Sequence, residues 1–352
     1  MTAYPATQVP DTVAATVNRP LTRPQTERFP DIDRAKGFAI ALVVWGHLAS
    51  VVTTNVPLWF YISISAIYSF HMPVFMYLSG FVFFLVDAPE RFWRSPASQI
   101  FARFNRLMVP FLFFGFVVVV GKFFVNSAGQ TVDPVGSIPE GLLKVLYNAP
   151  DNPSGSIWYL LVLFVYTIAA PILWKMGKNG LSLVILFGIL GWTLDVEEIF
   201  YLHRISIYFI FFGVGGVFAI YRIYILNFIK SYNLIFILIF GIICYYYFDH
   251  KFSLLICGLP AIPAIHGLFL QEFLKNDKIF LTLGKYSMAI YLLNTIILGI
   301  SGIALCLYLP DLANNFLFFI IILFFAGIFG PMIIRRGLNA IPFLKPVSRY
   351  FD

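Results

Sequence analysis

Ten apolar runs of membrane-spanning length follow one another along this chain, and they limit what it can fold into. The 352 residues are 60% hydrophobic and only 12% charged, whereas a soluble globular chain carries about 25% charged residues. Runs of about 20 apolar residues are typical of membrane helices, so the sequence predicts an all-α, polytopic helix bundle. The expected spans are residues 36–55, 68–86, 107–125, 156–174, 180–195, 204–221, 232–248, 252–270, 285–307 and 314–334.

Lys and Arg are distributed unequally between the two sides that ten spans define. With the N-terminus placed in the cytoplasm, all but four of the 24 Lys and Arg residues fall in cytoplasmic segments. The exceptions are Lys122, Lys144, Arg204 and Lys251. Because cytoplasmic loops carry an excess of Lys and Arg, we expect both termini in the cytoplasm. The formal net charge of +7 is then explained by topology, and nucleic acid is not an expected partner.

The ends of the chain and its longest outer segment differ in composition from the apolar runs. Residues 1–30 are rich in Pro and Thr and lack the apolar core of a signal peptide, which predicts a disordered cytoplasmic tail. Residues 31–340 are expected to form the membrane domain, and 341–352 a cytoplasmic C-terminal tail. The Pro- and Gly-containing stretch 126–155 is predicted to be a loop. The three cysteines lie in apolar runs without metal-ligand spacing, so no metal is expected.

Lys36 and His47 are eleven residues apart in the first apolar run. On a helix this spacing places both side chains on one face, ~16 Å apart along the axis. The expected span places Lys36 at the inner surface and the imidazole deep in the membrane. Ionisable groups inside a membrane are costly and are functional candidates. A neutral His47 could be a general base, a proton relay or a transient acyl acceptor, and the alternative is a structural hydrogen bond within the bundle.

Two later segments add candidates whose chemistry the residues leave open. His71 is expected at the outer end of the second span, where antiparallel packing could bring it near His47, and an interfacial hydrogen bond is the alternative. Ser79 and Gly80 form a small pair that permits close helix approach. The basic inner segment from Arg91 to Arg106 fits ordinary topology, and it also fits a patch that binds a phosphorylated cytosolic donor.

Together these segments resemble the acyltransferase 3 family of integral membrane acyltransferases. The first span is similar to the branch that includes fucose O-acetyltransferase-like proteins, which modify bacterial polysaccharides and nodulation signals. The matching positions are Asp33, Lys36, Gly37, Gly46, His47, the stretch 70–81, Arg103, Arg106 and Pro110, with weaker matches at 155–160, 208–213 and 283–293. Many relatives have His where this chain has Asn294, so no essential proton transfer is expected at that position.

The resemblance implies a ten-span enzyme of the bacterial inner membrane. It would take an acyl group, usually acetyl, from cytosolic acetyl-CoA to a sugar hydroxyl of an exported glycan. His47 would be the central catalytic residue, with His71 as a second catalytic candidate. Lys36, Arg103 and Arg106 would contact the donor. On the acceptor side we consider four aromatic or ionisable residues near the outer surface: Trp158, Tyr159, Glu198 and His203.

Two other functional classes fit the same bundle. A secondary transporter also has about ten spans and rare embedded ionisable groups, although no repeated halves are found in this sequence. A non-catalytic scaffold within a polysaccharide synthesis or export complex would tolerate loss of both Lys36 and His47. Acyl-CoA turnover that depends on His47 distinguishes the enzyme from solute flux without turnover.

Overall fold

The computed structural model describes residues 29–52, 56–127, 135–148, 150–176, 180–194 and 196–351. The predicted disordered tail therefore lies almost entirely outside the described residues. Helices dominate the described part of the chain, which contains no β-strand and a single isolated bridge between Asn148 and Ile199. The all-helical prediction is confirmed at this level.

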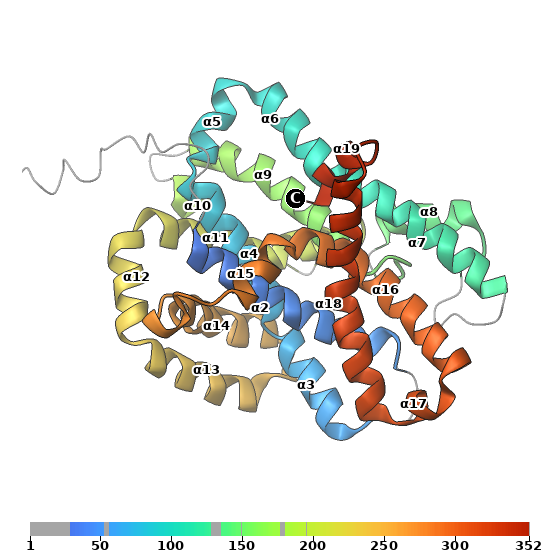
Figure 1. The fold of residues 1–352 in the computed structure, drawn as a ribbon. Coiled ribbons are helices and arrows are strands. Elements are labelled where there is room, and N and C mark those ends of the chain that lie inside the picture. The colour runs from blue at the N-terminus through green and yellow to red at the C-terminus, as the bar shows by residue number, and fades with distance from the viewer. Residues whose placement is uncertain are drawn as a thin grey trace, which may run out of the picture.

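The helices form one bundle, which Figure 1 shows from the side. The N-terminal half contains α2 (Pro30–His47), α3 (Leu58–Tyr68), α4 (His71–Leu85), α5 (Ala88–Arg94), α6 (Pro96–Arg103), α7 (Val109–Ser127), α8 (Ile138–Tyr147) and α9 (Trp158–Met176). The C-terminal half contains α10 (Gly180–Thr193), α11 (Leu202–Ile220), α12 (Arg222–Ser231), α13 (Asn233–Tyr247), α14 (Ser253–Phe269), α15 (Ile279–Lys285), α16 (Ser287–Tyr308), α17 (Pro310–Asn314), α18 (Phe316–Ala340) and α19 (Lys345–Ser348).

A helix occupies each of the ten predicted spans, although not every one meets the length of a membrane crossing. Among the described residues, six helical stretches are long and apolar enough to span, and the bent pair α12–α13 makes up to seven. The apolar helices α10 and α14 are shorter, and α2 carries four charged residues within its first two turns. The chain is thus a multi-pass membrane protein, while the count of ten and the cytoplasmic termini stay predictions.

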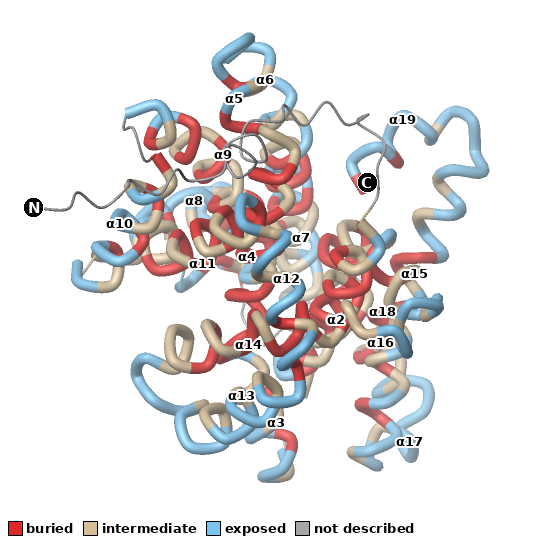
Figure 2. The backbone as a smooth tube through the Cα atoms, turned by 90° about the vertical axis from the view of Figure 1, so that its left-hand side faces the viewer, coloured by how far each residue is buried: buried red, intermediate tan, exposed pale blue. Residues whose placement is uncertain are grey.

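Helix α2 lies at the centre of the bundle, where close backbone contacts hold it. A Cβ atom on Gly37 would lie 1.9 Å from the Phe280 carbonyl oxygen, and one on Gly284 would lie 1.8 Å from that of Asp33. Helices α4 and α11 meet in the same way at Gly80, beside the Phe212 backbone. Small residues permit such approach between membrane helices, so the predicted packing role of Gly80 fits the structure. Figure 2 shows the buried residues gathered in these central helices.

A buried polar chain joins the first turn of α2 to α14 and α4. The Asp31 carboxylate accepts a hydrogen bond from His266 Nε2 at 3.2 Å. The other ring nitrogen, Nδ1, lies 2.5 Å from the Tyr77 hydroxyl and accepts a hydrogen bond from it. Both His266 and Tyr77 are almost fully buried. Since each polar atom of the imidazole has a partner, these bonds fix the first turn of α2 at little desolvation cost.

The Tyr77→Phe variant should lower the free energy of unfolding by about 1–3 kcal/mol, because it leaves the buried His266 Nδ1 without a partner. Thermal unfolding in detergent measures this change. Tyr245→Phe is the matched control, since Tyr245 is 76% exposed on α13. Equal melting temperatures for the two variants would contradict the stabilising role of the chain.

Two local features differ from the predictions, and the C-terminal segment adds a contact that they did not include. Helix α2 begins at Pro30 and ends at His47, because Pro is favoured at the first helical position and acidic residues stabilise the first turn. His47 is therefore the last residue of α2 rather than a residue in the middle of a helix from 36 to 55. The predicted loop 126–155 contains α8, whose N-cap Ser137 accepts a bond from Glu140 N–H. The C-terminal segment folds back, and its Phe351 packs on Phe114.

Candidate active site

His47 is held by a side chain from the far end of the sequence. Its Nδ1 lies 2.6 Å from Oδ1 of Asn294, which is fully buried on α16. The Asn294 amide nitrogen donates to the carbonyls of Ile290 at 2.6 Å and Tyr291 at 2.9 Å. These two bonds fix which way the amide points, so Oδ1 must accept from His47 Nδ1–H. The neutral imidazole then carries its lone pair on Nε2, the nitrogen free to act as a base.

The second histidine lies near the first, as antiparallel packing predicts. His71 begins α4 and is 5% exposed, and its Nδ1 donates to the Ile67 carbonyl at 2.8 Å. The two imidazoles interact electrostatically. The Tyr68 ring packs on the His71 ring, with 5.3 Å between the ring centroids. The Tyr68 hydroxyl donates a hydrogen bond to the Gly46 carbonyl at 2.8 Å. This contact ties the end of α2 to the junction of α3 and α4.

Hydroxyl side chains from α4, α9, α16 and the turn before α9 gather near Asn294. Ser79 Oγ and Tyr159 OH are 2.5 Å apart and join α4 to α9. The Tyr159 ring packs on the Tyr291 ring at 5.6 Å, one helical turn from Asn294. Ser156 Oγ lies 3.4 Å from Thr295 Oγ1 on the same helix. We call these five side chains the hydroxyl cluster: Ser79, Ser156, Tyr159, Tyr291 and Thr295.

The cationic end of the site combines two segments that are distant in sequence. Lys36 is half-buried on α2, and it interacts electrostatically with Asp33 and Arg106. Arg106 also interacts electrostatically with Tyr159, and this interaction links the cations to the hydroxyl cluster. Residues 104–108 form a π-helical turn, and Pro110 explains it, because proline lacks the N–H that would bond the carbonyl four residues earlier. This turn sets the direction of Arg106.

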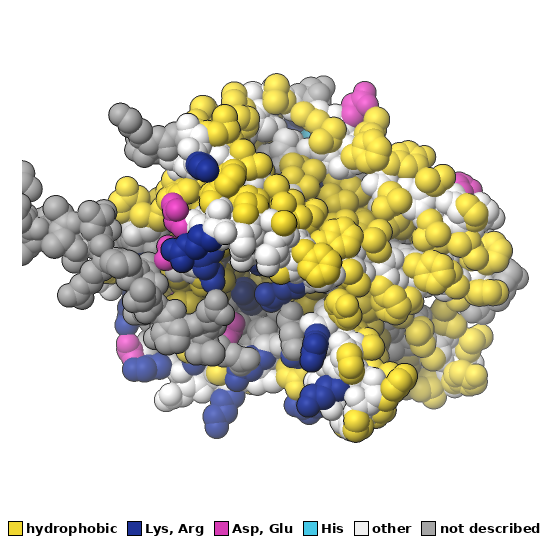
Figure 3. Space-filling model, turned by 90° about the horizontal axis from the view of Figure 1, so that it is seen from above, with side chains coloured by type: hydrophobic (Ala, Val, Ile, Leu, Met, Phe, Trp, Pro, Cys, Tyr) yellow, Lys and Arg dark blue, Asp and Glu magenta, His cyan; other side chains and the backbone are white. Residues whose placement is uncertain are grey.

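Arg103 shares this region without reaching Lys36 in any described contact. Its guanidinium lies 5.9 Å from the Phe83 ring centroid and interacts electrostatically with Arg91 and Arg106. Figure 3 shows Lys and Arg side chains gathered on one side of the face that it presents, while hydrophobic side chains cover the opposite side. A concentration of cations favours binding of an anionic ligand, and Arg pairs well with phosphate.

The four acceptor-side candidates divide into a closed cluster and one residue of the site. Trp158 is 8% exposed, with the Tyr208 ring at 5.0 Å and the Arg204 guanidinium at 5.0 Å from its ring. Glu198 pairs with Arg204 at 3.4 Å. His203 is half-buried in the first turn of α11. Since neighbouring side chains already pack on the Trp158 ring, Tyr159 is the candidate that the structure places beside the other site residues.

A comparison with known protein families identifies the family of this chain. A family model described as an acyltransferase domain, acyltransferase 3, matches residues 29–336. The chain belongs to the acyltransferase 3 family. No curated protein and no solved structure matches the chain. The match covers α2 to α18, so every residue of the candidate site lies within the acyltransferase domain.

The contact of His47 with Asn294 in this acyltransferase does not follow from the sequence pattern. Asn294 stands where many relatives have His, and the absence of an essential proton transfer at this position stays a prediction. The signal that could have found the contact is an uncharged but hydrogen-bonding residue in the middle of an apolar span, where polar side chains need partners. Among the described residues, no group of three or more His, Cys, Asp and Glu could hold a metal ion.

Proposed function

We propose that the acyltransferase moves an acetyl group from cytosolic acetyl-CoA to a sugar hydroxyl of an exported glycan, in the inner membrane of a bacterium. The observation that carries this proposal is the His47–Asn294 pair, which presents an unprotonated Nε2 at the end of the helix that also carries Lys36. The glycan acceptor would be an exopolysaccharide, O-antigen or lipo-oligosaccharide. Machinery for polysaccharide synthesis or export would be the associated partner.

The donor would enter from the cationic end. Lys36, Arg103 and Arg106 would bind the phosphates of acetyl-CoA, because Arg and Lys are the usual partners of phosphate. Lys36 and His47 are ~16 Å apart along the helix axis, a length comparable to an extended pantetheine arm. The Ser79 hydroxyl on α4 could bond an amide of the arm. The thioester would then reach the imidazole.

The acceptor would reach His47 from the opposite end. The residues that follow His47 form a short 3-10 turn in which Ala49 and Ser50 are exposed. The imidazole is therefore within one turn of the surface on the predicted outer side. A sugar hydroxyl could approach Nε2 there without crossing the bundle, and His71 lies close enough to contact the same substrate. Tyr159, Trp158, Glu198 and His203 stay proposed acceptor contacts.

The chemical step requires a base, because a sugar hydroxyl is a poor nucleophile at neutral pH. His47 Nε2 would take the hydroxyl proton as the oxygen attacks the thioester carbonyl. The carbon–sulfur bond breaks, and the imidazolium returns the proton to the CoA thiolate. Asn294 Oδ1 would stabilise the imidazolium through Nδ1–H. The same nitrogen would serve if the acetyl group passes through a transient acyl-His47, since Nε2 is again the atom that attacks.

Membranes containing the protein, supplied with radiolabelled acetyl-CoA, test the proposal. We expect the labelled acetyl group in the glycan fraction, and one molecule of unlabelled CoA released for each acetyl group transferred. Quenching with denaturing detergent at neutral pH during turnover distinguishes the two routes, because label bound to protein accumulates only through acyl-His47. Free acetate without labelled glycan would contradict the assigned acceptor, and no CoA release would contradict the reaction.

Lys36→Gln should raise the apparent KM for acetyl-CoA by about 5- to 10-fold with kcat nearly unchanged, because loss of one charge contact of about 1 kcal/mol weakens donor binding. The KM for the glycan should stay the same. Lys122→Gln on α7 is the matched control, since it removes a cation from the predicted outer half of the bundle. An equal rise in both KM values would contradict a donor-specific role.

A further inference from the structure

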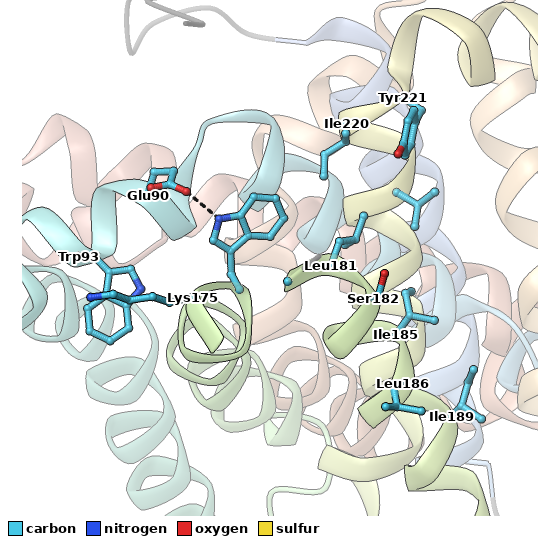
Figure 4. A pocket seen from close by; sticks show the side chains of 13 residues that line it. Glu90, Trp93, Lys175, Leu181, Ser182, Ile185, Leu186, Ile189, Ile220 and Tyr221 are labelled. Atoms are coloured by element: carbon cyan, nitrogen blue, oxygen red, sulfur yellow. Dashed lines mark hydrogen bonds between the residues drawn. The ribbon is translucent and has the colours of Figure 1, made fainter. Parts of the chain in front are cut away.

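A groove separate from the candidate active site opens among α5, α9, α10 and α11. Its volume is about 970 Å3, within the ~300–1,000 Å3 of typical small-molecule pockets. None of Lys36, His47 and Asn294 lines it. Figure 4 shows Glu90, Trp93 and Lys175 at one end of the groove. The acyl-transfer mechanism makes no use of this space.

The polar end of the groove is already ordered by its own contacts. Trp174 Nε1 donates to the Glu90 carboxylate at 2.7 Å, and Trp93 Nε1 donates to the Pro171 carbonyl at 3.0 Å. Lys175 Nζ lies 4.1 Å from the Trp93 ring centroid and stays exposed. Indoles and a cation at one level are typical of a membrane–water interface. A headgroup would therefore meet a site that needs little reorganisation.

The other end of the groove is apolar. Its walls come from the first three turns of α10 and the last turn of α11, and they include Leu181, Ile185, Leu186, Ile189 and Ile220. Several of these side chains are exposed, among them Leu186 at 47% and Ile189 at 48%. Helix α10 has 14 residues, about 21 Å of rise, against a hydrocarbon core of ~30 Å. A short helix with exposed apolar walls leaves room for a hydrocarbon chain beside it.

The charges around the polar end favour an anion. Lys175 lines the groove, and Arg91, Arg94 and Arg222 all act on Asp87 at the adjoining start of α5. These four cations outnumber the two carboxylates near them, those of Asp87 and Glu90. The Glu90 carboxylate already accepts a hydrogen bond from Trp174 Nε1. A phosphate is the anion that Lys and Arg bind at a membrane surface.

We propose that this groove binds an anionic glycerophospholipid of the inner leaflet. Its phosphate lies at Lys175 between the two indoles, and one acyl chain lies along α10 toward Ile189. The site is independent of the proposed acyl transfer, since it shares no residue with it. Bound lipid would hold α5 and α10 together at the cytoplasmic end of α9.

Native mass spectrometry of the full-length protein tests this site, with dioleoyl phosphatidylglycerol or dioleoyl phosphatidylcholine added in detergent. We expect phosphatidylglycerol to bind the wild type more tightly, and Lys175→Gln to weaken it about fivefold, equivalent to about 1 kcal/mol per cation. Ile185→Trp should fill the groove and weaken the binding of both lipids. Leu238→Trp, on the exposed side of α13, is the matched control and should bind like the wild type.

The outcomes separate headgroup from chain binding. Glycerol phosphate, which has no acyl chains, should fail to compete, and competition by it would show a free-phosphate site instead. Unchanged phosphatidylglycerol binding in both groove variants would overturn the proposal. Equal binding of the two lipids by the wild type would overturn the proposed preference for an anionic headgroup. Acyl transfer by Lys175→Gln and Ile185→Trp at wild-type rates would verify that both variants fold.

Discussion

His47→Ala should reduce acetyl transfer by about 10²- to 10⁴-fold, the contribution expected of a positioned general base. The variant removes Nε2 of His47, the atom proposed as the base. Folding should be little affected, because His47 is half-buried and the hydrogen bond described for its ring is the one to Asn294. Initial rates of labelled acetyl transfer in membranes, normalised to protein abundance, measure the effect.

The matched control for this prediction is His250→Ala. His250 is exposed in the turn before α14, where its Nδ1 accepts from the Phe252 N–H, so its loss should leave the rate unchanged. His71→Ala should give an intermediate loss if His71 contacts substrate. An active His47→Ala enzyme with normal abundance would remove both the direct route and the acyl-histidine route.

Asn294→Leu should lower kcat by about 10- to 100-fold, the equivalent of the roughly 1–3 kcal/mol lost when a buried donor loses its acceptor. Without Oδ1, His47 Nδ1–H has no acceptor and the ring can rotate or carry its proton on Nε2. The KM for acetyl-CoA should change little, because Asn294 acts on the base rather than on the donor phosphates. Steady-state kinetics with saturating glycan separate kcat from KM.

Two further variants distinguish this positioning role from a structural one. Asn294→Gln keeps an amide, with an acceptor for Nδ1–H and a donor for the carbonyls of Ile290 and Tyr291, and should recover part of the rate. Asn233→Leu removes another buried asparagine, whose amide donates to the Ala264 carbonyl at 2.9 Å, and should cost stability without lowering kcat. If Asn233→Leu and Asn294→Leu lowered kcat equally, general loosening of the bundle would explain both results.

The sequence predicted those parts of the fold that depend on local pattern. Apolar runs placed ten helices, and helical spacing correctly put Lys36 and His47 on one helix, because both properties are carried by neighbouring residues. The ends of α2 were wrong, since charged residues that look like a cytoplasmic flank are favourable in the first turn of a helix. The helix α8 was missed because its Pro139 reads as a loop signal but is tolerated at a helix start.

The composition of the site depended on contacts that no local pattern reveals. Asn294 is 247 residues from His47, and Tyr159 is 80 residues from Ser79. These pairs follow from how α16 and α9 pack against α2 and α4. Resemblance supplied His47, Lys36 and the Arg-containing segment, because motifs are read along the chain. Trp158 shows the converse, since its residue type does not reveal that Tyr208 and Arg204 pack on its ring.

Purified protein in liposomes, given acetyl-CoA on one side and glycan on the other, tests transfer across the membrane. Wild-type protein should make the glycan heavier by one acetyl group and release CoA on the donor side, and His47→Ala should do neither. A glycan of unchanged mass, together with solute flux that His47→Ala leaves intact, would contradict it.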